Sequence, residues 1–498
     1  MSKNIPKTKA SSRKRTNQKI TPQKVTHNPT PFKKHTKVLC TIGPSTDTVA
    51  QLQRMYKAGM NAVRINTAHT DVSQVTKLIR TVRKAVNVPI VVDIKGPELR
   101  IHSNAKYTFS KGDTFVIGFA KNAPISLNYN LKSAVYVHDT ILIQDGKYHL
   151  KIIKKSLNGF IVKAMNECII ESNKNVHIPG RKLPLPSLNS KDRKVLDSIR
   201  KKDVDYIALS FCRSKKDIEY VRKVLRDDSI GIIAKIENHE GIQNIEEIIR
   251  ASEGVMVARG DLGVELSPEQ VPLVQKLIIR ACNQEGKLVI VATQMLESMI
   301  TQESPTRAEI SDVANAVLDG ADCVMLSAET AIGKYPLKAV QYMSKTAANV
   351  ENSVVMQAYE RVKGSVSDAL AFSVSSICSD LPVSKILCLT VTGHTAQKIA
   401  RFRIRHIPVV AITTTERVQR QLMLYYGIVP IRYVPDFDYL DIPDILIALH
   451  RTSILSRKDL VVFTAGMFTN RDKKTNILQI HRVEDVLDYR KKFTKRKK

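Results

Sequence analysis

Short apolar runs alternate with amphipathic stretches over the first two thirds of the chain. Eight of these runs are rich in Val, Ile and Leu, and they predict strands that are buried on both faces. They are Val38–Ile42, Ala62–Asn66, Ile90–Ile94, Tyr206–Phe211, Ile232–Ile236, Val255–Ala258, Val289–Thr293 and Cys323–Ser327. Helix signals lie between them: capping boxes begin at Ser267 and Thr306, and Gly320 should end the second helix. Eight strand–helix units predict a (βα)8 TIM barrel.

The remaining pattern predicts two further domains. Apolar and polar residues alternate at Tyr136–Val137, Ile141–Ile143, Tyr148–Ile153 and Phe160–Ala164, so residues 100–183 should form a small all-β domain inserted after the third strand. Its place at the barrel rim suits a lid, and a passive insertion is the alternative. Helices at Asp368–Ser379 and Thr395–Arg403 alternate with strands at Lys385–Thr390, Pro408–Thr413 and Leu460–Thr464. The predicted α/β fold therefore has a barrel (36–99 and 184–352), a β lid (100–183) and a C-terminal open-sheet α/β domain (353–485).

Charge is concentrated at the two ends of the chain. The net charge is +31, and residues 1–35 contain ten Lys or Arg while residues 490–498 contain seven, with no acid in either segment. We expect a disordered basic arm over 1–35, a basic tail over 486–498 and weak binding of both to polyanions. The arm has no apolar segment of a secretory signal, and a transit peptide is the alternative.

Cysteine usage and hydropathy indicate the compartment. The seven cysteines form no CxxC pair and lie mostly in apolar runs, which favours free thiols in a reducing, cytoplasmic setting. No apolar run approaches the roughly 20 residues that span a bilayer, so we expect no membrane segment.

Charged residues follow two of the predicted buried strands. Lys235 and Glu237 lie at the end of one strand, and Asp261 follows the next between Gly260 and Gly263. Buried charges require a partner of opposite sign or a metal. Magnesium takes one or two protein carboxylates and completes its shell with water and substrate oxygens. The sequence therefore predicts a divalent-cation site with an anionic substrate, and a structural ion pair is the alternative.

Other polar residues occupy the same strand ends. They are Arg64 and Asn66, Asp93 and Lys95, Ser210, Thr293 and Glu329. Because active sites of such barrels lie at the C-terminal ends of the strands, this distribution favours a catalytic site.

At this point the motifs resemble those of a known family, pyruvate kinase, from Thr36 to about Val483. The matching stretches are Thr36–Pro44, Asp93–Arg100, Lys235–Gly241, Ala258–Gly263, Thr293–Met299 and Pro305–Glu309, in that order. The resemblance implies a phosphotransferase that moves the phosphoryl group of phosphoenolpyruvate to ADP, giving pyruvate and ATP in the last step of glycolysis. It also implies Mg²⁺ or Mn²⁺, K⁺ and a homotetramer.

The resemblance carries roles to individual residues. Glu237 and Asp261 match the ligands of the divalent ion, and Lys235 and Arg64 match residues that contact the transferring phosphoryl group. The backbone at Gly260–Asp261, together with Thr293, resembles the pocket for the substrate carboxylate, and Thr293 also matches a residue assigned to protonation of the enolate.

Nucleotide and potassium sites follow from the same resemblance. His69, Arg100, Lys191 and Asn66 resemble nucleotide-binding residues, and Asp145 resembles a lid residue that closes on the site. Asn66, Asp93 and the Ile94 carbonyl match potassium ligands. The family's usual serine ligand is replaced by Ala68, whereas Glu98 is retained where potassium-independent members carry lysine. The resemblance thus implies a potassium site that has lost one hydroxyl ligand.

Two other functions are compatible with parts of the pattern. A metal-dependent aldolase acting on pyruvate units would share a Glu/Asp metal pair, but it would need neither the β lid nor the Asp93–Arg100 run. A protein that binds nucleic acid or anionic surfaces on an inherited enzyme scaffold would account for the net charge of +31.

Overall fold

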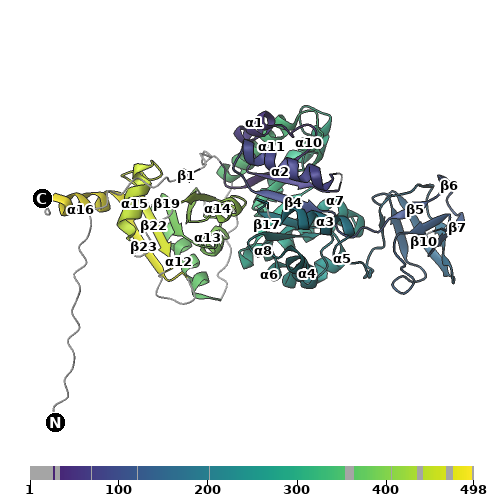
Figure 1. Ribbon diagram of the computed structural model, residues 1–498. Helices are drawn as coiled ribbons and strands as arrows, with labels where there is room; N and C mark the ends of the chain where they lie inside the picture. Colours follow the sequence, from purple (N-terminus) through teal and green to yellow (C-terminus); the bar gives the residue numbers. More distant parts are fainter. Residues whose placement is uncertain are drawn as a thin grey trace, which may run out of the picture.

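The chain folds into three bodies that lie in a row, with the barrel between the β insert and the C-terminal α/β domain (Figure 1). This computed structural model describes residues 26–27, 34–68, 70–120, 122–200, 202–353, 364–404, 406–433, 441–466 and 475–495. Within these ranges, no helix is both long enough and apolar enough to cross a membrane.

The eight predicted runs form the closed parallel barrel. Its strands are β2 (Lys37–Ile42), β3 (Ala62–Asn66), β4 (Ile90–Ile94), β14 (Tyr206–Leu209), β15 (Gly231–Ile236), β16 (Gly254–Ala258), β17 (Leu288–Ala292) and β18 (Cys323–Leu326). Every predicted strand is confirmed to within two residues. Their residues are almost all buried because side chains of both strand faces pack, one set inside the barrel and the other against its helices.

Helices cover the outside of the barrel. They are α1 (Val49–Ala58), α2 (Val72–Ala85), α3 (Ser190–Ile199), α4 (Lys215–Leu225), α5 (His239–Gln243), α6 (Ile245–Ala251), α7 (Arg259–Glu265), α8 (Val271–Glu285), α9 (Arg307–Leu318), α10 (Ala328–Ala331) and α11 (Pro336–Ser353), with a 3-10 turn η1 (Glu297–Ile300). The capping box at Thr306 is confirmed, with reciprocal bonds to Glu309.

The predicted helix start at Ser267 is wrong. Residues 267–270 form a turn and α8 begins at Val271. The reason is Pro272, which has no N–H to donate and is tolerated only in the first turn of a helix. A helix begun at Pro268 would have placed Pro272 in its second turn, where a backbone donor is required.

The β insert is confirmed as a separate sheet structure. A seven-stranded sheet has the order β13-β9-β10-β11-β7-β8-β5, and β12 pairs with β6. The bounds are β5 (Ile101–Ser103), β6 (Tyr107–Phe109), β7 (Thr114–Gly118), β8 (Ile125–Leu127), β9 (Thr140–Ile143), β10 (Tyr148–Lys155), β11 (Gly159–Ala164), β12 (Cys168–Ile170) and β13 (Val176–His177). The strand predicted at Tyr136–Val137 is wrong, because the Asp139 carboxylate accepts the Tyr136 N–H at 2.8 Å and stabilises a turn instead.

The C-terminal domain is an open α/β sheet, as predicted. Its strand order is β1-β21-β20-β19-β22-β23. The strands are β1 (Thr26–His27), β19 (Lys385–Leu389), β20 (Val409–Thr413), β21 (Ile428–Arg432), β22 (Leu460–Ala465) and β23 (Ile477–Arg482). The helices are α12 (Val366–Asp380), α13 (His394–Ala400), α14 (Glu416–Leu422), α15 (Ile442–Arg451) and α16 (Val483–Lys495).

Parts of both basic ends belong to regular elements. Thr26 and His27 pair antiparallel with Arg432 and Ile431, so part of the predicted disordered arm forms an edge strand of the C-terminal domain. The predicted tail from 486 continues as α16 to Lys495. Residues 1–25, 28–33 and 496–498 lie outside the described ranges.

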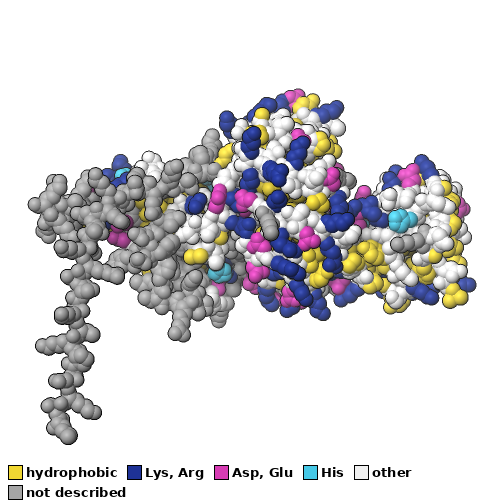
Figure 2. All heavy atoms as spheres, viewed as in Figure 1, with side chains coloured by type: hydrophobic (Ala, Val, Ile, Leu, Met, Phe, Trp, Pro, Cys, Tyr) yellow, Lys and Arg dark blue, Asp and Glu magenta, His cyan; other side chains and the backbone are white. Residues whose placement is uncertain are grey.

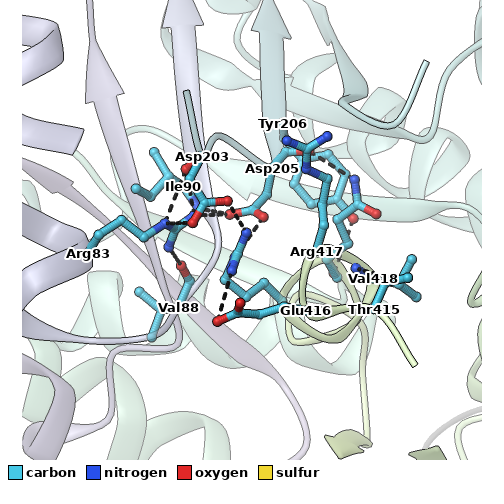
Figure 3. Close-up of polar contacts among 12 residues, drawn as sticks. Arg83, Val88, Ile90, Asp203, Asp205, Tyr206, Thr415, Glu416, Arg417 and Val418 are labelled. Carbon is cyan, nitrogen blue, oxygen red and sulfur yellow. Dashed lines mark hydrogen bonds and ion pairs between the residues drawn. The ribbon is translucent and has the colours of Figure 1, made fainter. Parts of the chain in front are cut away.

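Apolar packing and a buried ion cluster join the barrel to the C-terminal domain. One hydrophobic cluster includes barrel residues such as Tyr206 and Met256 together with Phe402 and Leu424. Beside it, Arg420 of α14 donates to Asp205, which immediately precedes β14, at 2.9 Å. Arg83 of α2 contacts the same Asp205 carboxylate at 2.6 Å (Figure 3). The orientation of the C-terminal domain is therefore fixed by both apolar and charged contacts.

Candidate active site

Lys235 and Glu237 form the centre of a charged cluster at the C-terminal end of β15. The Lys235 ammonium lies 2.7 Å from a Glu237 carboxylate oxygen, and the two residues are 8% and 1% exposed. Glu237 also accepts the Phe211 N–H at 2.6 Å. Parallel strands bring their ends to one edge of the barrel, so this cluster follows directly from the strand register.

Arg64 and Asp93 extend the cluster across β3 and β4. Arg64 Nε donates to Asp93 Oδ2 at 2.7 Å, and Lys235 Nζ lies 3.5 Å from Asp93 Oδ1. Thr41 accepts a bond from Arg64 Nη1 at 3.0 Å. Ser210 accepts one from Lys235 at 2.7 Å and donates to Asp93 at 3.3 Å. The predicted residues Arg64, Asp93, Lys235 and Glu237 thus form one connected network.

Burial and neighbouring charges shift the pKa values of three residues in the network. Burial lowers the pKa of Lys235, but Asp93 and Glu237 outweigh it and raise that pKa above its ordinary value. Burial raises the pKa of Asp93, yet Arg64 and then Lys235 lower it overall. Burial, opposed by Lys235 and reinforced by the charge of Asp261, raises the pKa of Glu237 to about 7. The negative charge of Asp261 thus disfavours the ionised form of Glu237.

Gly260, Asp261 and Thr293 lie on the next two strand ends. Gly260 donates its N–H to Thr293 Oγ1 at 2.8 Å, and Thr293 donates to the Ala292 carbonyl at 2.6 Å. Asp261 lies in the first turn of α7, and the preceding Ala258 provides no side-chain cap for that helix. The first turn of α7 thus has no side-chain cap for its backbone N–H groups.

A wide cavity opens at this edge of the barrel. It has a volume of about 1070 Å³ and is lined by Gly260, Asp261, Thr293 and Glu329, with Asp145 from the β insert on its border. Glu329, expected at a strand end, accepts the N–H groups of Leu296 and Ser327 and is therefore engaged in holding loops. The cavity gives a small substrate access to Asp261, Gly260 and Thr293.

The residues expected to bind nucleotide or potassium are only partly brought together. Lys191 of α3 donates to the Ala68 carbonyl at 3.2 Å, which brings it beside the loop after Asn66. Asn66 and Asp93 are register partners in β3 and β4, and Ile94 follows in β4. Arg100 lies at the base of the β insert and donates to Glu98 at 2.6 Å. His69 lies outside the described residues.

Sequence reasoning missed Arg259 as a positioning residue. Thr293 and Gln294 adopt φ values of 68° and 54°, which are unfavourable for residues other than glycine. Arg259 donates to the carbonyls of Thr293 at 2.7 Å and of Gln294 at 3.0 Å, and it pairs with Asp312 at 2.7 Å. The sequence signal that could have indicated this role is the position of Arg259 directly before Gly260 and Asp261. Thr41 and Ser210 were likewise not assigned a role in orienting Arg64 and Lys235.

Comparison with known proteins identifies the family. Residues 33–340 match the model of the pyruvate kinase barrel domain, and residues 368–481 match that of the pyruvate kinase alpha/beta domain. The pyruvate kinase of Geobacillus stearothermophilus is 38% identical over 92% of this chain and 81% of its own length, and that of Clostridium acetobutylicum is 38% identical over 90% and 99%. The crystal structure of a pyruvate kinase from Cryptosporidium parvum superposes with a TM-score of 0.83 at 33% identity, covering 91% of this chain and 96% of that one. The chain belongs to the pyruvate kinase family, whose members transfer the phosphoryl group of phosphoenolpyruvate to ADP.

Proposed function

We propose that the cluster at the ends of β3, β4, β15, β16 and β17 is where this chain transfers the phosphoryl group of phosphoenolpyruvate to ADP. The observation that supports this most directly is the buried network of Arg64, Asp93, Lys235 and Glu237 at the C-terminal ends of the barrel strands. Two fixed cations at one strand edge, with water largely excluded, suit a transition state whose charge spreads over phosphoryl oxygens.

Glu237 and Asp261 are the proposed ligands of Mg²⁺ or Mn²⁺. Burial and the neighbouring Asp261 raise the pKa of Glu237 to about 7 although Lys235 is 2.7 Å away, so this pair of carboxylates accommodates a second positive charge. The described residues contain no group of three or more His, Cys, Asp or Glu side chains that could hold a metal. Two carboxylates still suffice for Mg²⁺, which completes its shell with substrate and water. A divalent ion bound there supplies positive charge to the phosphoryl oxygens.

Lys235 and Arg64 are the proposed contacts of the transferring group. In the reaction, the bond between phosphorus and the enol oxygen breaks while a bond to the terminal ADP oxygen forms, and the enolate carbon then takes a proton. Ser210 and Thr41 orient the two cations. Gly260, Asp261 and Thr293 would hold the substrate carboxylate, and Thr293 would direct protonation through water.

The nucleotide and potassium assignments remain proposals. The proposed ADP-binding residues are Asn66, His69, Arg100 and Lys191. The contact of Lys191 with the Ala68 carbonyl supports the grouping of Lys191 with Asn66, which lies two residues before Ala68. Asn66, Asp93 and the Ile94 carbonyl would bind K⁺, supported by the register of β3 with β4. The β insert would act as a lid, since Asp145 borders the cavity.

One assay tests the function. Pyruvate formation from phosphoenolpyruvate should require both ADP and Mg²⁺ and should yield one ATP per pyruvate. Pyruvate formed from phosphoenolpyruvate without ADP would indicate phosphatase chemistry instead, whereas an aldolase would form no pyruvate from phosphoenolpyruvate. If the protein showed no turnover but bound RNA tightly, the result would support the alternative of a nucleic-acid-binding protein on an inherited enzyme scaffold.

Three wider properties are also proposed. A cytoplasmic location is supported by seven free cysteines, six of them buried. A homotetramer is supported by the family resemblance, and light scattering would test it. Weak polyanion binding through the basic ends is supported by their 17 cations without an acid (ten plus seven), whereas Figure 2 shows acidic side chains interspersed among the basic ones on the visible barrel face.

A further inference from the structure

The β insert, which projects from the barrel (Figure 1), is both basic and rich in exposed apolar side chains. Residues 100–183 contain 13 Lys or Arg but only five Asp or Glu, an excess of eight among the 14 net charges that remain once the 17 at the chain ends are set aside. The insert also holds six of the fifteen large hydrophobic side chains that are exposed among the described residues, although it is about one sixth of the chain. Exposed apolar side chains that gather in one region mark interaction sites.

The strand register places several of these side chains on one face of the sheet. Lys151 of β10 is directly opposite Lys163 of β11. In the next row, Lys154 of β10 is opposite Ile161 of β11, and Ile161 is opposite Val116 of β7. The residues that alternate with them along β10 and β11 are buried in the core of the insert. We refer to Val116, Lys151, Lys154, Ile161 and Lys163 as the outer face of the insert.

The lysines of the outer face lack a carboxylate partner. Lysine ion pairs within the described part of the insert go to Glu171, and none of them involves Lys151, Lys154 or Lys163. Like charges that are directly opposite on neighbouring strands destabilise a sheet. The pairing of Lys151 with Lys163 therefore favours a negatively charged partner for this face.

Aliphatic side chains continue the outer face to the tip of the β10–β11 hairpin. Leu157 at this tip is 85% exposed, and Ile153, at a bulge of β10, is 40% exposed. Neither these two residues nor the five of the outer face are aromatic, so the surface offers no platform on which nucleic-acid bases could stack. Aliphatic side chains among lysines instead suit the boundary between the headgroups and the acyl chains of an anionic lipid layer.

The hairpin tip lies far from the catalytic cavity. The eight residues of β10 separate the turn that contains Asp145 from the tip that contains Leu157, a length of about 27 Å at the usual rise per strand residue. Asp145 borders the catalytic cavity, whereas no residue of the outer face lines it. A partner bound at the tip therefore leaves the cavity accessible to substrate.

We propose that the outer face of the β insert, together with Leu157, docks on an anionic phospholipid surface. Lys151, Lys154 and Lys163 contact the phosphate and carboxylate groups of the lipids, and Leu157 enters the layer between the headgroups. This interaction goes beyond phosphoryl transfer and uses no residue of the catalytic cluster.

Sedimentation of the full-length protein with vesicles tests the proposal. We expect binding to vesicles of equal parts phosphatidylcholine and phosphatidylserine, and much weaker binding to vesicles of phosphatidylcholine alone. Lys151→Gln/Lys163→Gln should weaken binding to the anionic vesicles about 25-fold, because each lysine near such a surface accounts for about fivefold. Leu157→Ser changes no charge and should weaken it about tenfold, since a buried leucine is lost.

A second pair of lysines provides the matched control. Lys106→Gln/Lys174→Gln removes the same two charges from the insert, but these lysines pair with Glu171 and lie outside the outer face. The control should weaken vesicle binding less than about threefold, because salt screens charges that do not touch the lipid. Circular dichroism should be unchanged in all variants, since Lys151, Lys163 and Leu157 are exposed.

The outcomes separate the alternatives. The basic chain ends are present in every variant, so their contribution to vesicle binding is constant. Binding is measured without substrate and therefore does not depend on the proposed catalytic function. Unchanged vesicle binding in Leu157→Ser and in Lys151→Gln/Lys163→Gln overturns the proposal, and so do equal losses in the outer-face and control pairs. If Lys151→Gln/Lys163→Gln weakens binding of RNA but not of vesicles, the partner is a nucleic acid and the lipid proposal is wrong.

Discussion

Replacing Arg420 with methionine should weaken the docking of the C-terminal domain onto the barrel. Arg420 is 2% exposed, and its guanidinium contacts Asp205 at 2.9 Å, Glu416 at 3.4 Å and also Asp203. Methionine fills much of the same space. The substitution therefore removes mainly the charge and its hydrogen bonds.

The magnitude depends on what Asp205 retains. Removing one partner of a buried ion pair costs roughly 3–5 kcal/mol when the other charge is left alone. Asp205 would keep Arg83 at 2.6 Å and the Ile90 N–H at 2.8 Å, so we expect the lower end, about 3 kcal/mol. That loss is a change of about a hundredfold in the equilibrium between docked and undocked states.

A neighbouring arginine provides the matched control. Arg417 lies on the same helix, but its side chain is 26% exposed and its partner Asp227 is 24% exposed, so Arg417→Met should cost less than about 1 kcal/mol. Urea unfolding followed by circular dichroism gives the midpoints, and hydrogen exchange in β14 and α14 locates the loss. Combining Arg420→Met with Asp205→Asn should cost less than the sum of the single changes. Equal effects of Arg420→Met and Arg417→Met, or strict additivity, would refute the reasoning.

Four further outcomes follow from the proposed site. Glu237→Gln and Asp261→Asn should each abolish turnover with an unchanged circular dichroism spectrum, because each removes a ligand of the divalent ion; near-normal rates in either variant would contradict that assignment. Lys235→Met should lower kcat by about 10³ with a much smaller change in the KM for phosphoenolpyruvate, and the opposite split in steady-state kinetics would make Lys235 a ground-state anchor. KCl should activate the enzyme relative to tetramethylammonium chloride. Ala68→Ser should improve the apparent affinity for potassium, because in the present chain a water molecule replaces the missing serine hydroxyl at a cost of roughly 0–2 kcal/mol. Full activity without K⁺ would exclude the potassium site. Deleting residues 1–25, which keeps β1, should leave kcat unchanged and reduce the salt-sensitive binding of RNA; unchanged RNA binding across a salt series would reject a role for the arm.

The sequence alone determined the barrel and the chemistry at its rim. Strands buried on both faces leave continuous apolar runs, so β15 and β17 were located from residues such as Ile232–Ile236 and Val289–Val291 without knowledge of their neighbours. Lys235 and Glu237 could be assigned to one rim because parallel strands all end at the same edge. Local chemistry likewise determined the start of α9 at Thr306, where the cap and Glu309 are three residues apart.

Only the tertiary structure decided the contacts between distant segments. The pairing of Thr26 with Arg432 involves a two-residue strand, which is too short to leave a periodic pattern. The turn at Thr293 is held by Arg259, 34 residues away, and a cavity between the barrel and the C-terminal domain combines Lys34 with Lys345 and His406. Such groupings depend on how helices and domains dock. Docking is set by the shape and burial of whole surfaces, and single residues carry no local signal for it.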